Sequence, residues 1–445
     1  MNVAPTPVPL FQSSARPASV RYAPNTSSPI ENNTQGRPIA PQKRFSMPVP
    51  LTPEHITASG AIGASRSPSL PFADAESALE EKCDLFFASW PASPVRIKPE
   101  EVPATSTGVD QLISARQFVD ALELCQRVEK DNLEKDAVIK LGTLYRKSYV
   151  LLAMGQLETL QKELLLYDDF KAHGKLEAKD SDSDPMLESL VFKLDIIRAI
   201  FPYLFSRTAT TASDALMRLG QLRDSRDAET VALHEDEQNL PDDYLTSDIL
   251  VLLSDGTETS VRQQRYLCEN LMLWVLVHQG YLDAAIRMIG DMIQTYSHDK
   301  AVCEVMHAQM GYCFLLLGSV QSASAHFKQA SSKRKKFYDG LIAVANGQFP
   351  QAIVSFEGIL KEHDDWIAAS VNLSIAYFYD GKISDAVAHL EEWIKRNPHG
   401  RTTNRVILNL NTMHDLMPSR EFQRRKLLRM INMYARDFVN PTLLK

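Results

Sequence analysis

Apolar residues recur at every third or fourth position through most of the chain after residue 108. One such run contains Leu141, Leu144, Tyr145, Leu151 and Leu152. An α-helix completes a turn in 3.6 residues, so this spacing puts the apolar side chains on one face of a helix. No run shows the alternation of apolar and polar residues, with hairpin turns, that is typical of β-strands. The pattern predicts an all-α fold in which helix follows helix.

A short phrase, glycine-x-apolar-x-x-alanine, recurs several times within this helical pattern. It begins at Gly280, Gly318, Gly347 and Gly381, with spacings of 38, 29 and 34 residues. The glycine can take the left-handed conformation that ends a helix, and the alanine lets the next helix pack closely. Helix–turn–helix units that repeat about every 34 residues are typical of the tetratricopeptide repeat, whose pairs stack into a solenoid. Weaker copies begin at Gly155 and Arg116.

Composition and pattern together divide the chain into five regions. We predict a disordered tail over residues 1–72, because it holds 13 of the 24 prolines and too little apolar surface to offset the entropy of ordering. A short helix and a proline-rich linker follow over 73–107. Degenerate helical repeats over 108–260 include an acidic loop at 224–243. Tetratricopeptide repeats occupy 261–400, and capping helices occupy 401–445.

Charge and cysteine content bear on which partners and which cellular compartment we expect for this protein. The 48 basic and 55 acidic residues give a net charge of -7, unlike the strongly basic domains that bind nucleic acid. The five cysteines form no CxxC pair and have no histidine partners at zinc-ligand spacing, so we interpret them as reduced thiols in a cytosolic protein. The sequence shows no secretory signal and no apolar run of the ~20 residues that cross a bilayer. We expect membrane association to be peripheral and to go through partners.

Catalytic signatures are missing from the sequence, which contains no GxSxG, GxxxxGK, HExxH or GxGxxG motif. The string from Asp180 to Asp184 starts like a calcium loop, but Pro185 and Val191 occupy the places that need a glycine and a bidentate glutamate. We predict no enzyme activity, no cofactor and no metal site. Two basic stretches, 328–336 and 420–429, are either solvated helix faces or contacts for acidic lipids or an acidic partner.

The repeat itself predicts a binding surface, because the first helices of stacked repeats line an extended concave side. Large side chains on those helices are the candidates for partner binding. They are Trp274, His278, Tyr312, Leu315, Phe378 and Tyr379. For each of them a place in the hydrophobic core is the open alternative.

The stretch from Trp366 to Lys445 resembles the C-terminal region of the subunit-twelve family of the trafficking protein particle (TRAPP) complex. The residues WIAASVNLSIAYFYDGKISDAVAHLEEWIKRNPHG and the Asn-Leu-Asn-Thr-Met segment at 409–413 carry the likeness, which extends over 110–445. The resemblance implies a non-catalytic scaffold subunit of a vesicle-tethering complex, acting in transport from the endoplasmic reticulum to the Golgi and in autophagy. It also implies binding to other subunits, a cytoplasmic location at early secretory membranes, and a link to the kinetochore in mitosis.

Two other functions stay open at this point. One is a generic tetratricopeptide-repeat adaptor for mitotic or chaperone partners. Asn270 and Asn372 suit the clamp by which such adaptors hold a peptide carboxylate, but the matching basic residues are missing. The other is an enzyme whose site no motif reveals, in which a concave pocket would gather titratable groups with perturbed pKa values.

Overall fold

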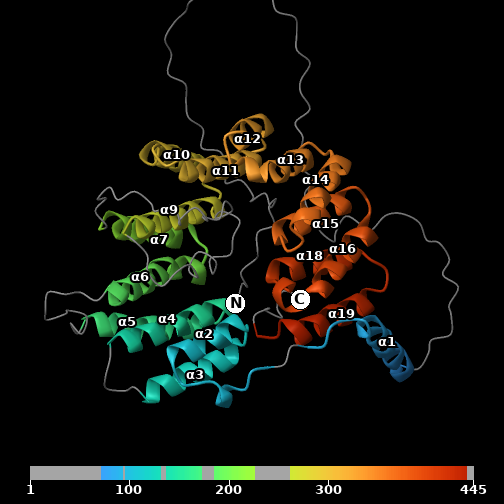
Figure 1. The fold of residues 1–445 in the computed structure, drawn as a ribbon, viewed down its shortest axis with the longest axis horizontal. Helices are drawn as coiled ribbons and strands as arrows, with labels where there is room; N and C mark the ends of the chain where they lie inside the picture. Colours follow the sequence, from blue (N-terminus) through green and yellow to red (C-terminus); the bar gives the residue numbers. More distant parts are fainter. Residues whose placement is uncertain (1–71, 94–95, 132–136, 173–184, 226–260, 438–445) are drawn as a thin grey trace, which may run out of the picture. The chain divides into compact units, whose positions relative to one another are not determined.

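The computed structural model describes residues 72–93, 96–131, 137–172, 185–225 and 261–437 (Figure 1). Every regular element in these ranges is a helix, as the apolar spacing predicts. The predicted tail over 1–72 lies outside the described residues except for Phe72, and so does the calcium-like string. The acidic loop over 224–243 also lies outside them, apart from its first two residues. The described residues from Lys82 onward belong to one compact unit.

The helices form pairs joined by short turns, and successive pairs pack on one another. The pairs are α2 (Ser106–Ser114) with α3 (Phe118–Asp131), α4 (Ala137–Ala153) with α5 (Leu157–Ala172), α6 (Pro185–Phe205) with α7 (Ala209–Asp224), α9 (Val261–His278) with α10 (Leu282–Thr295), α11 (Lys300–Leu316) with α12 (Val320–Phe327), α13 (Lys335–Ala345) with α14 (Phe349–Glu362), α15 (Ile367–Tyr379) with α16 (Ile383–Arg396), and α18 (Asn404–His414) with α19 (Arg420–Tyr434). Helix α1 (Phe72–Phe87), η2 (Pro99–Glu101), η4 (Ser332–Arg334) and α17 (Pro398–Arg401) complete the described elements. The tetratricopeptide-like, all-α fold class is confirmed, whereas the division into five regions stays a prediction.

The hairpin turns at the predicted glycines share one backbone conformation, in which the glycine has a positive φ angle. The φ angles are 68° at Gly155, 77° at Gly280, 76° at Gly318, 71° at Gly347 and 82° at Gly381. After α11, the Gly318 amide donates to the Leu315 carbonyl oxygen at 2.9 Å, and the next amide donates to the Phe314 carbonyl oxygen at 2.8 Å. These two bonds form the Schellman motif, which ends a helix with a left-handed residue. The glycine phrase therefore predicts the turns correctly.

The weakest copy of the phrase has Arg116 in place of glycine. Arg116 has a φ of 54°, a conformation that costs a residue with a Cβ atom about 1–2 kcal/mol. Its guanidinium donates to the carbonyl oxygens of His399 at 3.1 Å and Gly400 at 3.4 Å. These bonds offset the strain, and they connect the first hairpin to α17.

Small side chains lie where the helices of a pair approach most closely. Ala323 is fully buried, as the phrase predicts. A Cβ atom added at Gly311 would lie 2.4 Å from the Phe327 ring, and one added at Gly340 would lie 2.7 Å from the Phe356 ring. The aromatic ring four positions after the alanine therefore packs directly onto the glycine of the preceding helix. This contact sets the spacing within the α11–α12 and α13–α14 pairs.

Replacing Ala323 with leucine is expected to lower the free energy of unfolding by about 1–3 kcal/mol, because added methylene groups overpack a fully buried contact. Ala325 lies on the same helix but is exposed, so Ala325→Leu is the matched control. Urea unfolding curves of the two variants measure the difference. Equal stability of the two variants would contradict the predicted repeat register.

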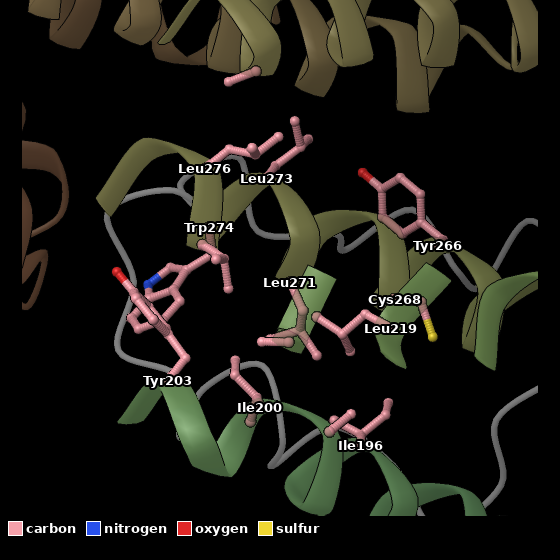
Figure 2. Packing of buried hydrophobic residues seen from close by; sticks show 14 of the residues in the cluster. Ile196, Ile200, Tyr203, Leu219, Tyr266, Cys268, Leu271, Leu273, Trp274 and Leu276 are labelled. Carbon is pink, nitrogen blue, oxygen red and sulfur yellow. The ribbon is translucent and has the colours of Figure 1, made fainter. Parts of the chain in front are cut away.

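One large cluster of buried apolar side chains lies where α6, α7 and α9 meet (Figure 2). Ile200 and Tyr203 come from α6, Leu219 from α7, and Leu271 and Trp274 from α9. The rings of Tyr203 and Trp274 meet edge to face, with 5.8 Å between their centroids. Helices on either side of residues 226–260 thus share one core. The degenerate pairs and the clear repeats are therefore continuous.

The chain that precedes the first hairpin packs onto the last one. Phe87, at the end of α1, is buried in one cluster with Met430, Ile431 and Tyr434 of α19. The Trp90 ring stacks on the Tyr434 ring, with 6.1 Å between centroids. The apolar surface of the last helix pair is therefore covered by residues that lie more than 300 positions earlier, a contact that the local sequence pattern does not predict.

Ion pairs also join the residues before the first hairpin to the C-terminal residues. Arg96 contacts the Asp437 carboxylate at 2.8 Å and the Asp120 carboxylate of α3 at 2.9 Å. Arg429 of α19 pairs with Asp84 of α1 at 2.6 Å. Ion pairs thus hold the linker after α1 to the first repeat and to Asp437 beyond α19, and they hold α1 itself to α19.

Candidate interaction surface at the hairpin turns

Trp274 and His278, two of the six candidate residues, lie at the end of α9. Trp274 is only 4% exposed. The two rings are 4.0 Å apart, and His278 Nδ1 lies 2.8 Å from the Trp274 carbonyl oxygen. Burial lowers the pKa of His278 to about 4, so the ring is neutral near pH 7 and its Nδ1–H donates to that oxygen. The pair is a packed, partly buried unit beside the α9–α10 turn.

Tyr312 and Leu315 lie inside the fold. Both are buried in the core cluster that α11 shares with α12 and α13. The Tyr312 ring meets the Phe327 ring edge to face at 5.5 Å and the Tyr338 ring at 6.4 Å. These two residues support the helix pair from within. Whether any of the six candidates binds a partner stays a prediction.

Phe378 and Tyr379 lie at the end of α15, where a partly exposed aromatic cluster forms. Tyr379 is 49% exposed, and its ring stacks on Phe349 of the preceding repeat with 5.6 Å between centroids. The Phe378 ring meets Tyr379 edge to face at 5.3 Å. Phe349 was not among the candidates, although it occupies the apolar place of the phrase that begins at Gly347. That place in the phrase is the signal that could have found it.

Two other turns also carry exposed apolar side chains next to the turn glycine, one after it and one before it. Tyr281 follows its turn glycine and is 44% exposed, and Leu317 precedes its turn glycine and is 47% exposed. Stacked repeats bring corresponding turns to one edge, because each repeat has the same helix–turn–helix geometry. We call this set of residues the turn edge: Tyr281, Leu317, Phe349, Phe378 and Tyr379. Aromatic side chains of this kind are enriched at protein interfaces.

The buried titratable groups of the repeats are held by neighbours within the fold. Burial raises the pKa of Glu269, while the Tyr296 hydroxyl donates to its carboxylate at 2.8 Å. His307 and His326 face each other with 3.2 Å between their Nδ1 atoms, and burial lowers the pKa of both. No cluster of three or more histidine, cysteine or carboxylate side chains suited to a metal ion occurs in the part of the chain that the structure describes.

Helix pairs closed by left-handed glycines, spaced by small residues and packed around continuous cores define a tetratricopeptide-type helical-repeat protein. No protein-family model matches the chain. Trafficking protein particle complex subunit 12 of Homo sapiens is 22% identical to it over 364 residues, which are 75% of this chain and 47% of that protein. The corresponding protein of Mus musculus is 26% identical over 149 residues, which are 31% of this chain and 19% of that protein. The resemblance to the TRAPP subunit 12 family is thereby confirmed, although the chain spans about half the length of the human relative that it matches.

Solved structures include a tetratricopeptide repeat protein from Parabacteroides merdae, which is 14% identical and covers 68% of this chain and 97% of its own. Its TM-score of 0.36 is too low for the likeness to add to what this chain's own turns and cores show.

Proposed function

We propose that this chain is a non-catalytic scaffold subunit of a TRAPP-type vesicle-tethering complex and binds other subunits through its helical repeats. The observation that carries the proposal is the similarity to TRAPP subunit 12 over 364 residues. On this proposal the protein acts in transport from the endoplasmic reticulum to the Golgi, and in autophagy, at the cytoplasmic side of early secretory membranes. Because the chain spans about half of that relative, its place in the complex belongs to the proposal as well.

The turn edge is the surface that we propose for the contact with other subunits. The rings of Phe349 and Tyr379 are already held in place by stacking on each other between repeats, so binding a partner there requires little ordering of these side chains. Large aromatic residues that become buried on association supply most of the energy in many interfaces. The packed pair at the end of α9 lies beside the same kind of turn. Tyr312 and Leu315 would contribute only by supporting the helix beneath it.

The double substitution Phe349→Ala with Tyr379→Ala is expected to weaken co-purification of other subunits at least roughly tenfold, since buried aromatic anchors each contribute about 2 kcal/mol or more. The control is Leu165→Ala with Leu166→Ala. These leucines of α5 are 55% and 59% exposed and lie outside the turn edge. Affinity purification with quantitative mass spectrometry measures the effect, and thermal melts confirm that both variants fold.

Full co-purification by the Phe349 and Tyr379 variant would show that other surfaces carry the contact. The scaffold function itself has a separate test, gel filtration of cell extract. A scaffold subunit should elute with a complex far larger than its own 49.9 kDa. Elution as a lone monomer would contradict the proposed function whatever the turn edge does. Deletion of 1–72 is expected to leave the large complex intact.

A further inference from the structure

The two basic stretches of the chain differ in how many of their cations pair with carboxylates of the chain. In the stretch 420–429, on α19, three cations pair with carboxylates of the chain: Arg420 with Asp415, Lys426 with Glu391, and Arg429 with Asp84. Lys426 is only 4% exposed. This stretch therefore serves the packing of the C-terminal helices.

The stretch 328–336 runs from the end of α12 through η4 to the first two residues of α13 (Figure 1), and we call it the basic turn. Lys336 pairs with Glu362 of α14, and the Arg334 guanidinium lies 5.2 Å above the Trp366 ring. Lys328, Lys333 and Lys335 are exposed, and none of them pairs with a carboxylate or a ring among the described residues. Three cations of this turn are thus available to an outside partner.

Acidic residues are also missing from the sequence before the basic turn. No aspartate or glutamate occurs between Glu304 and Asp339, although the whole chain has a net charge of -7. Arg334 is the N-cap of α13, and Lys335 and Lys336 are its first two residues. The N-terminus of a helix carries a partial positive charge that favours acidic residues there. Cations at this end repel the helix dipole, and such a conflict with local preference is typical of functional sites.

Buried aromatic residues hold the basic turn on both sides. Before it, the Phe327 ring of α12 stacks on the Tyr338 ring of α13, with 4.5 Å between centroids. After it, the Phe337 ring stacks on the Trp366 ring at 4.7 Å. Ala330, in the middle of the turn, is 8% exposed. The backbone is therefore fixed, and only the flexible lysine side chains extend from it.

We propose that the basic turn binds anionic phosphate head groups on a membrane surface directly. Lysine is depleted at protein interfaces, whose strongest contacts need a buried aromatic or arginine anchor. Here the aromatic residues already lie in the core and the arginine is stacked on Trp366. Lysine is a compact charge on a flexible stem, and clusters of basic residues are attracted to anionic lipid surfaces. Since no helix in the described ranges is long and apolar enough to cross a bilayer, this contact would be peripheral. It would add a membrane contact that does not go through a partner subunit.

Flotation of the full-length chain with lipid vesicles tests the proposal. The chain is mixed with vesicles of phosphatidylcholine and phosphatidylserine, or of phosphatidylcholine alone. It is expected to bind only the anionic vesicles and to lose binding as salt is raised, because salt screens the attraction. The triple substitution Lys328→Gln, Lys333→Gln and Lys335→Gln is expected to weaken binding roughly one hundredfold, since each lysine near an anionic surface contributes about fivefold.

The matched control is Lys130→Gln with Lys140→Gln and Lys162→Gln. These lysines of α3, α4 and α5 are exposed, and their loss changes the net charge equally. The control is expected to bind anionic vesicles like the wild-type chain. Equal binding by the two triple variants, or no binding by the wild-type chain, would overturn the proposal. Loss of subunit co-purification by the basic-turn variant, with wild-type vesicle binding absent, would assign the turn to an acidic protein instead. Because the vesicle assay uses the isolated chain, its failure would leave the scaffold function untouched.

Discussion

Replacing Phe87 with alanine is expected to lower the free energy of unfolding by about 3–5 kcal/mol, the usual cost of removing a buried phenylalanine ring. Phe87 is 6% exposed and packs with the apolar residues of α19, while the Arg429 guanidinium lies 5.3 Å from its ring. Its loss leaves a cavity beneath the last helix pair. Urea unfolding followed by circular dichroism measures the change.

The control for this experiment lies on the same helix. Leu85 of α1 is 71% exposed, so Leu85→Ala is expected to change stability by less than about 0.5 kcal/mol. A Phe87→Ala protein that unfolds at the same urea concentration as the Leu85→Ala protein would show that α1 is not docked on α19. The contrast also separates loss of packing from loss of helix propensity, because both substitutions introduce alanine.

Acidification from about pH 6.5 to about pH 4 is expected to destabilise the fold by about 3 kcal/mol for each of two partly buried histidines, at the rate of 1.36 kcal/mol per pKa unit. Burial lowers the pKa of both His278 and His389 from 6.5 to about 4. The unfolded chain therefore takes up protons on these rings at a higher pH than the folded chain does. Their neutral forms stabilise the fold above the unfolded pKa, and this stability is lost as the pH falls through the window.

The free energy of unfolding, measured from urea curves at several pH values, tests this expectation. The double substitution His278→Gln with His389→Gln is expected to flatten the slope between about pH 6.5 and about pH 4, because glutamine does not titrate there. Exposed His363 supplies the control, His363→Gln. An unchanged slope in the double variant would mean that other groups cause the acid sensitivity.

Local patterns predicted the parts of the fold that depend on neighbours in sequence. The turn glycines stop helices within their own hairpins, and Ala323 contacts the helix just before it. Such contacts join residues less than one repeat apart, so spacing and residue type suffice to predict them. The apolar place of the phrase puts Phe349 beside its turn, whereas its stacking on Tyr379 of the next repeat does not follow from the phrase.

Which of the candidate residues are exposed could not be predicted from local pattern alone. Helical position alone places Tyr312 and Tyr379 at comparable places, near the ends of first helices. In the structure Tyr312 is 3% exposed and Tyr379 is 49% exposed. The difference arises because Phe327 and Tyr338 cover the Tyr312 ring, whereas the Tyr379 ring stacks on Phe349 at the turn. Which aromatic ring is covered depends on side chains of other helices. A helical wheel shows the residues of one helix only, so it does not predict this coverage.

By itself the sequence determined that this chain is a stack of helix pairs, where the pairs turn, and which small residues let them approach. Only the tertiary structure decided that Phe87 and Trp90 cover the last pair. It also decided that three cations of α19 are paired, whereas Lys328, Lys333 and Lys335 of the basic turn are not paired within the described residues. The reason is physical. Turns and helix faces follow from interactions over a few residues, whereas coverage and charge pairing depend on contacts such as Arg429 with Asp84, which are 345 positions apart.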